Sequence, residues 1–273
     1  MKSVKAIAIG GFDGMHVGHQ KLFEAVGDEG AVLVIETGYA NLTPKREREN
    51  HTHLKLFYYD LEEIRHLDAE GFVNKLYQEF PKLEKIVVGY DFHFGKDRCY
   101  SFDDLREIFR GEVKIVAEVK VDDDSVHSHK IRAKLQIGDI KGANRFLGYN
   151  YSVEGLHVKG QGLGKKELFA TINIDVKGSL LPKEGVYVTT VRLGDEEHYR
   201  SAVSFIGHRV STDGTFAVET HILDDEVEDI EKIRLSFIDF IRPNQKFDDL
   251  ETLKAAIAQD IAVAKRKSGR LSL

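Results

Sequence analysis

The sequence predicts an α/β domain followed by a small antiparallel β-barrel within one chain of 273 residues. In the first half, short apolar runs alternate with segments that carry apolar residues at helical spacing, which is typical of a parallel sheet covered by helices. After about Gly148, the helical spacing gives way to six short strand-like runs separated by turn residues. Runs of this length and spacing indicate a six-stranded barrel. We therefore expect two domains, residues 1–147 and 148–273.

The expected elements can be assigned in order from periodicity. In the first half, strands are predicted at Val4–Ile9, Ala31–Ile35, Ile86–Val88 and Val113–Val119, and helices at 20–26, 72–80 and 102–109. In the second half, strands are predicted at 151–158, 168–174, 185–191, 202–206, 216–223 and 233–241, followed by a terminal helix with Leu250, Leu253, Ile257 and Ile261 on one face. Residues 36–66 carry the weakest pattern. Within them we expect Lys45–Asn50, a mixed-charge run, to be a solvated loop or helix face.

Composition limits the classes of partner and compartment. The net charge of −6 gives no electrostatic support for nucleic-acid binding. Cys99 is the single cysteine, so no intramolecular disulfide framework is expected, and the chain suits a reducing cytoplasm. No apolar run approaches the roughly 20 residues of a membrane helix, and no signal peptide is evident. We expect small-molecule partners, and the sequence leaves homo-oligomer formation open.

The segment from Gly10 to His19 carries the clearest chemistry. It follows an apolar run and precedes an amphipathic one. The pattern therefore predicts a strand that leads through a glycine-rich turn into the N-terminus of a helix. Glycines allow a phosphate to approach the backbone closely, and the first amides of a helix face that phosphate. His16 and His19 can donate hydrogen bonds to a phosphate as its charge grows. The alternatives are an ordinary tight turn with polar histidines, or a two-histidine metal site whose third ligand does not follow at a recognisable spacing.

The pattern Gly-x-Phe-Asp-Gly-x-His-x-Gly-His resembles the nucleotidyltransferase motif of bacterial bifunctional riboflavin kinase/FAD synthetases. This resemblance implies that residues 1–147 form a Rossmann-like FMN adenylyltransferase domain. It implies a catalytic role for His16 and His19. It also implies ATP or FMN binding by Gly11, Phe12, Asp13, Gly14 and Gly18.

Two further stretches of the first half resemble blocks of the same family. Gly89–Arg98 is similar to Val-Gly-x-Asp-Phe-x-Phe-Gly-x-x-Arg, and Val126–Arg132 lies where the family carries Ile-Ser-Ser-Thr-x-Ile-Arg. The departures are Tyr90 for an acidic residue, and His127 and His129 for a serine and a threonine. From the residues alone, these stretches could equally be a polar loop with packed aromatics and a simple helix cap. The implied ATP- or FMN-binding residues are Gly89, Asp91, Phe92, Gly95, Arg98, Ser128 and Arg132.

The second half resembles the riboflavin kinase module of the same family. The matches include the stretches Phe169–Asn173, Gly185–Tyr187, Phe205–Arg209 and Phe240–Phe247. Departures include Leu168 for a glycine, and Ala170 and Val210 for prolines. The resemblance implies ATP or flavin binding by Gly160, Gly164, Lys165, Phe169, Tyr187 and Arg242. It further implies that Thr171 and Asn173 hold Mg²⁺ through hard oxygen atoms.

Glu219 is the expected general base of this second half. It is the only acidic residue in its apolar run, Phe216–Leu223. Its neighbours should point to the opposite side of the strand, so Glu219 faces either the barrel interior or solvent. We expect the inward position, because a charge there would mark a site. An ordinary surface glutamate is the alternative.

Together the resemblance implies an ATP-dependent transferase that makes FMN from riboflavin in the barrel and FAD from FMN in the α/β domain. ATP would be the co-substrate of both reactions and Mg²⁺ the cofactor, with riboflavin, FMN and FAD as substrates and products. Two alternatives remain at this point. One is an FAD synthetase whose barrel binds flavin without kinase activity, and the other is a non-catalytic flavin or nucleotide sensor.

Overall fold

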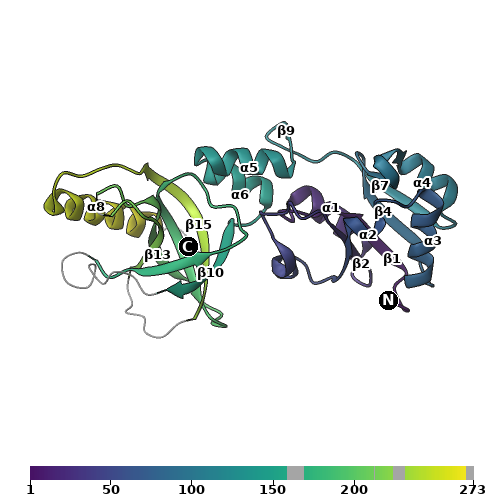
Figure 1. Cartoon of the computed structure of the whole chain (residues 1–273), viewed down its shortest axis with the longest axis horizontal. Coiled ribbons are helices and arrows are strands. Elements are labelled where there is room, and N and C mark those ends of the chain that lie inside the picture. Colours follow the sequence, from purple (N-terminus) through teal and green to yellow (C-terminus); the bar gives the residue numbers. More distant parts are fainter. Residues whose placement is uncertain (159–168, 212, 224–230, 269–273) are drawn as a thin grey trace. The chain divides into compact units, whose positions relative to one another are not determined.

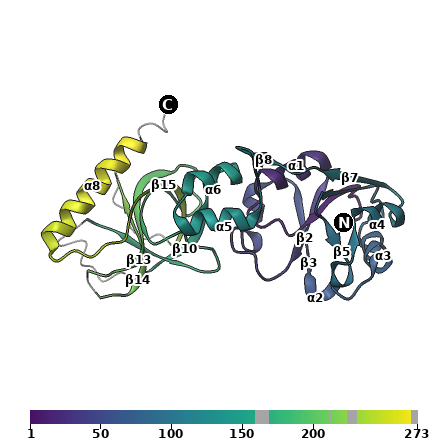
Figure 2. The ribbon, with the colours of Figure 1, turned by 90° about the horizontal axis from the view of Figure 1, so that it is seen from above.

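The computed structural model describes residues 1–158, 169–211, 213–223 and 231–268. The chain divides into two compact units, Met1–Ser128 and His129–Leu273. Figure 1 labels many of the elements of each unit, and Figure 2 gives a second view of them. Helices α5 (Ser128–Ile137) and α6 (Ile140–Leu147) therefore fall almost wholly in the second unit. The functional boundary between residues 147 and 148 stays a prediction, and it lies just after α6.

The first unit is built on a parallel sheet with strand order β3-β2-β1-β4-β7. Its strands are β1 (Ala6–Gly10), β2 (Ala31–Glu36), β3 (Lys55–Asp60), β4 (Lys85–Gly89) and β7 (Glu112–Val116). The chain builds outward from β1 first to one side and then to the other. The order therefore reverses between β1 and β4, which is where open α/β sheets bind ligands.

Helices cover both faces of this sheet. They are α1 (Val17–Val26), α2 (Leu61–Ile64), α3 (Ala69–Glu79) and α4 (Phe102–Ile108), with short 3₁₀ turns at Lys45–His51 and Lys96–Arg98. Two two-stranded ribbons complete the unit: β5 (His93–Phe94) with β6 (Tyr100–Ser101), and β8 (Lys120–Val121) with β9 (Asp124–Ser125). The alternation of strand and helix expected from the sequence is confirmed.

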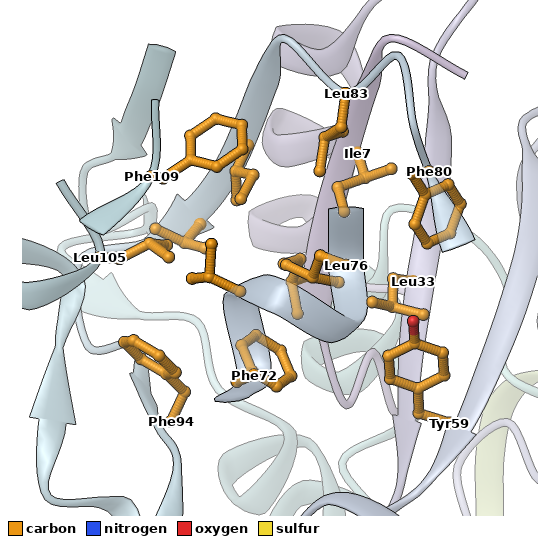
Figure 3. Packing of buried hydrophobic residues seen from close by; sticks show 14 of the residues in the cluster. Ile7, Leu33, Tyr59, Phe72, Leu76, Phe80, Leu83, Phe94, Leu105 and Phe109 are labelled. Carbon is orange, nitrogen blue, oxygen red and sulfur yellow. The ribbon is translucent and has the colours of Figure 1, made fainter. Parts of the chain in front are cut away.

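The core is divided by the sheet, because successive strand residues point to opposite faces. Ile7 of β1 packs with Phe72 and Leu76 of α3 (Figure 3). Ile9 of the same strand belongs to this cluster as well. Ala8, between them, belongs to the other cluster, together with residues of α1. Because both faces are buried, β1 reads as a continuous apolar run rather than an alternating one.

The second unit contains a closed barrel with strand order β10-β11-β14-β13-β12-β15, and every pairing is antiparallel. The strands are β10 (Ser152–Val158), β11 (Ile172–Val176), β12 (Gly185–Leu193), β13 (Arg200–His208), β14 (Phe216–Ile222) and β15 (Lys232–Pro243). The expected six-stranded barrel is confirmed. The terminal helix, α8 (Leu250–Ser268), is confirmed as well.

The inside of the barrel can be distinguished from its outside by what alternate residues touch. On β13, Val203 and Phe205 belong to the cluster that includes Ala264 of α8, so they face outward. Ser204, between them, is fully buried and joins Thr189 and Thr220 in a chain of hydroxyl groups with two oxygen–oxygen distances of 2.8 Å. These three residues therefore face the barrel interior.

No helix in the described ranges is long and apolar enough to cross a membrane.

Candidate functional sites

The glycine-rich turn links the end of β1 to the start of α1 at the switch point of the sheet. Gly14 has a φ of 83°, a left-handed conformation that glycine adopts without strain. A Cβ on Gly18 would lie 3.1 Å from two atoms of the His16 ring. A side chain at Gly18 would therefore press on His16, which explains a glycine between the two histidines.

His16 and His19 form a stacked pair at the start of α1. Their ring centroids are 3.5 Å apart with planes 19° from parallel. His16 caps the helix, because the backbone N–H of His19 donates to His16 Nδ1 at 3.3 Å. The Nδ1 atom of His19 is buried and has no hydrogen-bond partner among the described residues. Since buried polar atoms are normally paired in proteins, this nitrogen is a candidate contact for a ligand.

Burial keeps both imidazoles neutral near pH 7. Burial, and then the charge of His127, lower the pKa of His16 to about 4. Burial, followed by the charges of His16, Arg48 and His127, holds the pKa of His19 well below its usual value. A neutral imidazole still donates one N–H. The pair can therefore donate to a developing phosphate charge without carrying a positive charge of its own.

Asp13 holds the loop that follows β2. Its carboxylate accepts hydrogen bonds from the backbone N–H groups of Asn41, Leu42 and Thr43 at 3.3, 3.0 and 3.0 Å. Thr43 Oγ1 in turn accepts from the N–H of Gly14 at 2.7 Å. Asp13 is 9% exposed, so its contacts position the turn. Phe12 is 2% exposed and packs in the core beside α1.

The expectation that Lys45–Asn50 is a solvated segment is wrong for Arg48, which is buried. The segment lies in a 3₁₀ helix, and the Arg48 side chain is fully buried. Its guanidinium donates to the carbonyl oxygens of Phe12 and Gly11, each at 3.2 Å, and to Glu36 Oε1 at 2.5 Å. Sequence reasoning missed this residue because its partners lie in the glycine-rich turn and β2, far from it along the chain.

Within the first unit, parts of the three motif stretches come together at the carboxyl ends of β1 and β4. Ser128 Oγ donates to the backbone oxygen of Asp13 at 2.7 Å. The hydroxyl of Tyr90 lies 3.4 Å from His127 Nε2 and donates to Glu118 Oε1 at 3.2 Å. Gly89 ends β4, which is paired directly with β1. These contacts and this pairing place parts of the three stretches close together.

The remaining predicted residues of this unit divide into packed and exposed ones. Phe92 is 9% exposed and belongs to the core beneath α3. Asp91 and Arg98 are exposed, and Gly95 has a φ of 69°. Arg132 is half-buried and lies on α5, outside the first unit. For these residues, and for Gly11, ligand contact stays a prediction.

In the second unit, the predicted metal ligand and the predicted base lie side by side. Asn173 of β11 pairs directly with Glu219 of β14. Arg209 joins them: its Nε donates to Glu219 Oε1 at 2.8 Å and its Nη2 donates to Asn173 Oδ1 at 2.8 Å. Sequence reasoning matched Arg209 to a family block without assigning it to the site.

The expected inward position of Glu219 is wrong. Thr220 faces the interior, where it bonds to Ser204, so strand alternation places Glu219 on the outer face of the barrel. Its cross-strand partner on β13 is Phe205, which also faces outward. The Glu219 side chain is 25% exposed. A site on this barrel therefore lies on its outer wall rather than in its lumen.

Two more predicted residues lie at the start of β11. Thr171 is exposed and precedes Asn173 by two residues, which favours the same side of the chain. Phe169 is half-buried, with its ring 5.5 Å from that of His221. The backbone oxygen of Ala170 lies 2.8 Å from His221 Nδ1. These contacts gather Phe169, Thr171 and Asn173 beside the outer face of β14.

Tyr187 and Arg242 have structural partners. Tyr187 is fully buried, donates to the carbonyl oxygen of Lys183, and has a pKa raised by burial. This placement supports packing rather than ligand contact. Arg242 forms an ion pair with the buried Asp260 of α8, with Nη2 2.8 Å from Oδ2. Burial raises the pKa of Asp260. Gly160, Gly164 and Lys165 lie outside the described residues.

The oxygen atoms near β11 suit a hard cation. Thr171 supplies a hydroxyl and Asn173 an amide oxygen, and Mg²⁺ takes such ligands while keeping several waters. Elsewhere in the described ranges, no group of three or more His, Cys, Asp or Glu residues is arranged to hold a metal ion. Oxygen donors of this kind fit Mg²⁺, and its binding at Thr171 and Asn173 stays a prediction.

Comparison with known proteins finds two family models that match this chain. A riboflavin kinase family model matches residues 147–268, and an FAD synthetase model matches residues 48–130. A bifunctional riboflavin kinase/FMN adenylyltransferase of Listeria monocytogenes is 30% identical, over 94% of this chain and 90% of the relative. The chain belongs to this family. A relative with the same description from Mycoplasma pneumoniae is 29% identical, over 96% of this chain and 97% of the relative.

A solved structure shares the whole fold. The crystal structure of a protein described as a macrolide-efflux protein from Streptococcus pneumoniae has a TM-score of 0.83 and 26% identity, covering 97% of this chain and 95% of that one. The efflux role in that description belongs to the Streptococcus protein alone. For this chain, the likeness shows that its fold is shared with that structure over 97% of its length.

Two departures from the family's pattern touch each other in this member. Tyr90 stands where the family carries an acidic residue, and His127 stands where it carries a serine. The contact between them links the loop after β4 to the segment that precedes α5. The charge of His127 also contributes to the lowered pKa of His16. Of the two departures, His127 is the one that acts electrostatically on the histidine pair.

Proposed function

We propose that the chain catalyses two successive transfers from ATP: phosphorylation of riboflavin to FMN by the barrel, and adenylylation of FMN to FAD by the α/β unit. The observation that carries this proposal is that each unit assembles its own set of reactive side chains. The first unit stacks His16 on His19 at the strand switch point. The second pairs Asn173 with Glu219.

In the first unit, a phosphate oxygen of FMN attacks the α-phosphorus of ATP, and pyrophosphate leaves. Transfers of this type need positioning and charge stabilisation more than covalent catalysis. Neutral His16 and His19 donate to the oxygens on which charge develops. The N-terminal amides of α1 face the same position, and Arg48 keeps the turn in place through Gly11 and Phe12.

In the second unit, the terminal hydroxyl of the ribityl chain attacks the γ-phosphorus of ATP, and ADP leaves. Glu219 accepts the hydroxyl proton, as a general base within hydrogen-bond reach can. Thr171 and Asn173 hold Mg²⁺, which neutralises phosphate charge. The pairing of Asn173 with Glu219 supports an active barrel over one that only binds flavin.

We propose that its partners are these small-molecule substrates, with no nucleic acid and no membrane, and that it works in the cytoplasm. The acidic balance of the chain and its single cysteine support this. The net charge offers no general attraction for nucleic acid. Homo-oligomer formation is compatible with these roles.

The test is to incubate the purified protein with riboflavin, Mg²⁺ and ATP and to separate riboflavin, FMN and FAD over time. FMN should appear first and FAD should follow. A parallel reaction that starts from FMN isolates the second step. ADP formation that requires riboflavin establishes the kinase activity. If supplied FMN is converted to FAD but riboflavin is not converted to FMN, only the adenylyltransferase activity is present. Flavin binding without any turnover would indicate a sensor.

A further inference from the structure

Arg209 occupies the centre of the barrel site, although neither of the two proposed chemical roles uses it. The residue lies just after β13, and its side chain is 18% exposed. Nε and Nη2 both lie within 2.8 Å of Glu219 Oε1, and Nη2 also donates to Asn173 Oδ1. One guanidinium nitrogen is therefore shared between the proposed base and the proposed metal ligand.

The third nitrogen is held by the turn that follows. Nη1 donates to Thr215 Oγ1 at 3.0 Å and lies 3.6 Å from Asp213 Oδ2. The backbone of the turn closes on the same residue, because the N–H of Arg209 donates to the carbonyl oxygen of Thr215 at 2.9 Å. These contacts fix the guanidinium from one side while Nη2 points at the site.

The contact with Asn173 is the part of this arrangement that a nucleotide would change. An amide oxygen that accepts from a guanidinium has one lone pair engaged, and a cation beside a metal ligand opposes metal binding. A guanidinium binds phosphate oxygens more strongly than a neutral amide oxygen, because the acceptor is charged. Without nucleotide, the chain thus holds the Arg209 guanidinium, which suits a phosphate, against Asn173. Asn173 must be released from this contact before it can bind the metal.

We propose that Arg209 is a phosphate-binding residue of the riboflavin kinase site and that its Nη2 moves from Asn173 Oδ1 to a phosphate oxygen when the nucleotide binds. The move frees Asn173 for the metal, while the Nε contact keeps Glu219 in place beside the flavin hydroxyl. This inference rests on the proposed kinase function. It also explains how the side chains of the site are kept in order before the nucleotide binds.

The kinetic test compares Arg209→Ala and Arg209→Lys in the full-length protein, with FMN formation measured against ATP concentration. Arg209→Ala should raise the KM for ATP about tenfold and lower kcat about 10²-fold, the scale for one lost transition-state donor. Arg209→Lys keeps the charge without the planar fork and should fall between. FAD formation from FMN, measured on the same preparations, should stay at the parent rate.

The matched control is Arg234→Ala, which removes another guanidinium–carboxylate pair of the barrel, with Glu154. It should leave the KM for ATP unchanged. The proposal is overturned if Arg209→Ala leaves both the KM for ATP and the kcat of FMN formation unchanged. It is also overturned if Arg209→Ala speeds FMN formation, because the contacts of Arg209 with Asn173 and Glu219 would then only block the site. An equal loss in Arg234→Ala would likewise overturn it, because the effect would be structural.

A second readout does not depend on turnover. The side-chain Nε–H resonance of Arg209, assigned by its absence in Arg209→Lys, should shift when ADP and Mg²⁺ are added with riboflavin. If the parent protein makes no FMN but this resonance shifts, the kinase function fails while the assignment of Arg209 to phosphate binding holds. An unchanged resonance at saturating nucleotide would contradict the assignment itself.

Discussion

Asn173 on β11 and Glu219 on β14 lie directly opposite each other on the outer wall of the barrel, and the same arginine donates to both. This relationship ties together two roles that were inferred separately. A hard oxygen ligand and a carboxylate base must act on the same phosphate-transfer reaction. Antiparallel pairing supplies that proximity with no contribution from a flexible loop.

Replacing Glu219 with glutamine should remove most FMN formation. The substitution keeps the shape of the side chain and removes the base, so a loss of about 10²–10⁴-fold is expected. FAD formation from FMN should be unaffected, and both rates can be read from the same chromatographic assay. Glu154→Gln, which alters the carboxylate paired with Arg234 in the same barrel, is the matched control. Parent-level phosphorylation in Glu219→Gln would make Glu219 an ordinary surface residue.

Replacing His19 with alanine should lower FAD formation by about 10²-fold or more, because one donor to the developing phosphate charge is lost. FMN formation should be spared. His16→Ala should have a similar effect, whereas His16→Asn retains the helix cap and separates capping from catalysis. His53→Ala removes an exposed histidine paired with Asp28 and should change neither rate. Unchanged adenylylation in both alanine variants would exclude the pair from the mechanism.

Arg48 and Arg46 offer a contrast within one 3₁₀ helix. Arg48→Ala removes a buried guanidinium that holds the glycine-rich turn and should lower the free energy of unfolding by roughly 3–5 kcal/mol, with at least a tenfold loss of FAD formation. Arg46 is 87% exposed beside Glu49, so Arg46→Ala should have almost no effect. Denaturant titration and the FMN-to-FAD assay measure the two effects. Equal stability in the two variants would contradict the structural role of Arg48.

The buried histidine pair should make the α/β unit sensitive to acid. The pKa of His16 is lowered to about 4 in the folded chain, so the unfolded chain binds a proton more readily than the folded one. Stability is therefore complete above about pH 6.5 and falls as the pH drops toward 4, by roughly 3 kcal/mol from this group alone. Amide exchange of β1 and α1 peptides at several pH values measures the fall. His16→Asn should reduce it, and an identical pH dependence in that variant would contradict the assignment.

The two helices before the barrel should contribute to its stability. Asn144 of α6 donates to the carbonyl oxygen of Phe237 at 2.9 Å, and its own side-chain oxygen accepts from the N–H of Tyr151 at 2.8 Å. Fragments 148–273 and 129–273 should both fold with strand-dominated circular dichroism. The longer fragment should be more stable by roughly 3 kcal/mol, because α6 buries apolar side chains such as Phe146. Equal thermal midpoints would show that α5 and α6 are dispensable.

Much of this structure follows from local pattern. The apolar runs located most strands, and the His-x-Gly-His spacing located the histidine pair, because both depend on residues close along the chain. The role of Arg48 could not be predicted in this way. A mixed-charge run looks the same whether solvated or folded over a distant turn, and the carbonyl groups that bury Arg48 belong to Gly11 and Phe12.

The direction of Glu219 shows a second limit of sequence reasoning. Alternation establishes that Glu219 and Thr220 point to opposite sides of β14, but it does not say which side is the interior. That is decided by Ser204 on β13, which bonds Thr220 inside the barrel. Which side of a strand is buried is therefore decided by its pairing with strands that are distant along the chain. A carboxylate in an apolar run need not face inward.

The buried chain of Thr189, Ser204 and Thr220 bears on how this barrel tolerates sequence change. A slip of one residue between β12, β13 and β14 would turn the three hydroxyl groups outward or leave them buried without partners. Their mutual hydrogen bonds therefore favour one register among β12, β13 and β14, and they do so without the outer wall. In that register, Glu219 of β14 lies opposite Phe205 of β13. Sequence changes in the loops, such as Ala170 and Val210, can therefore accumulate without shifting Glu219 along the barrel wall, where the proposed phosphate transfer needs it.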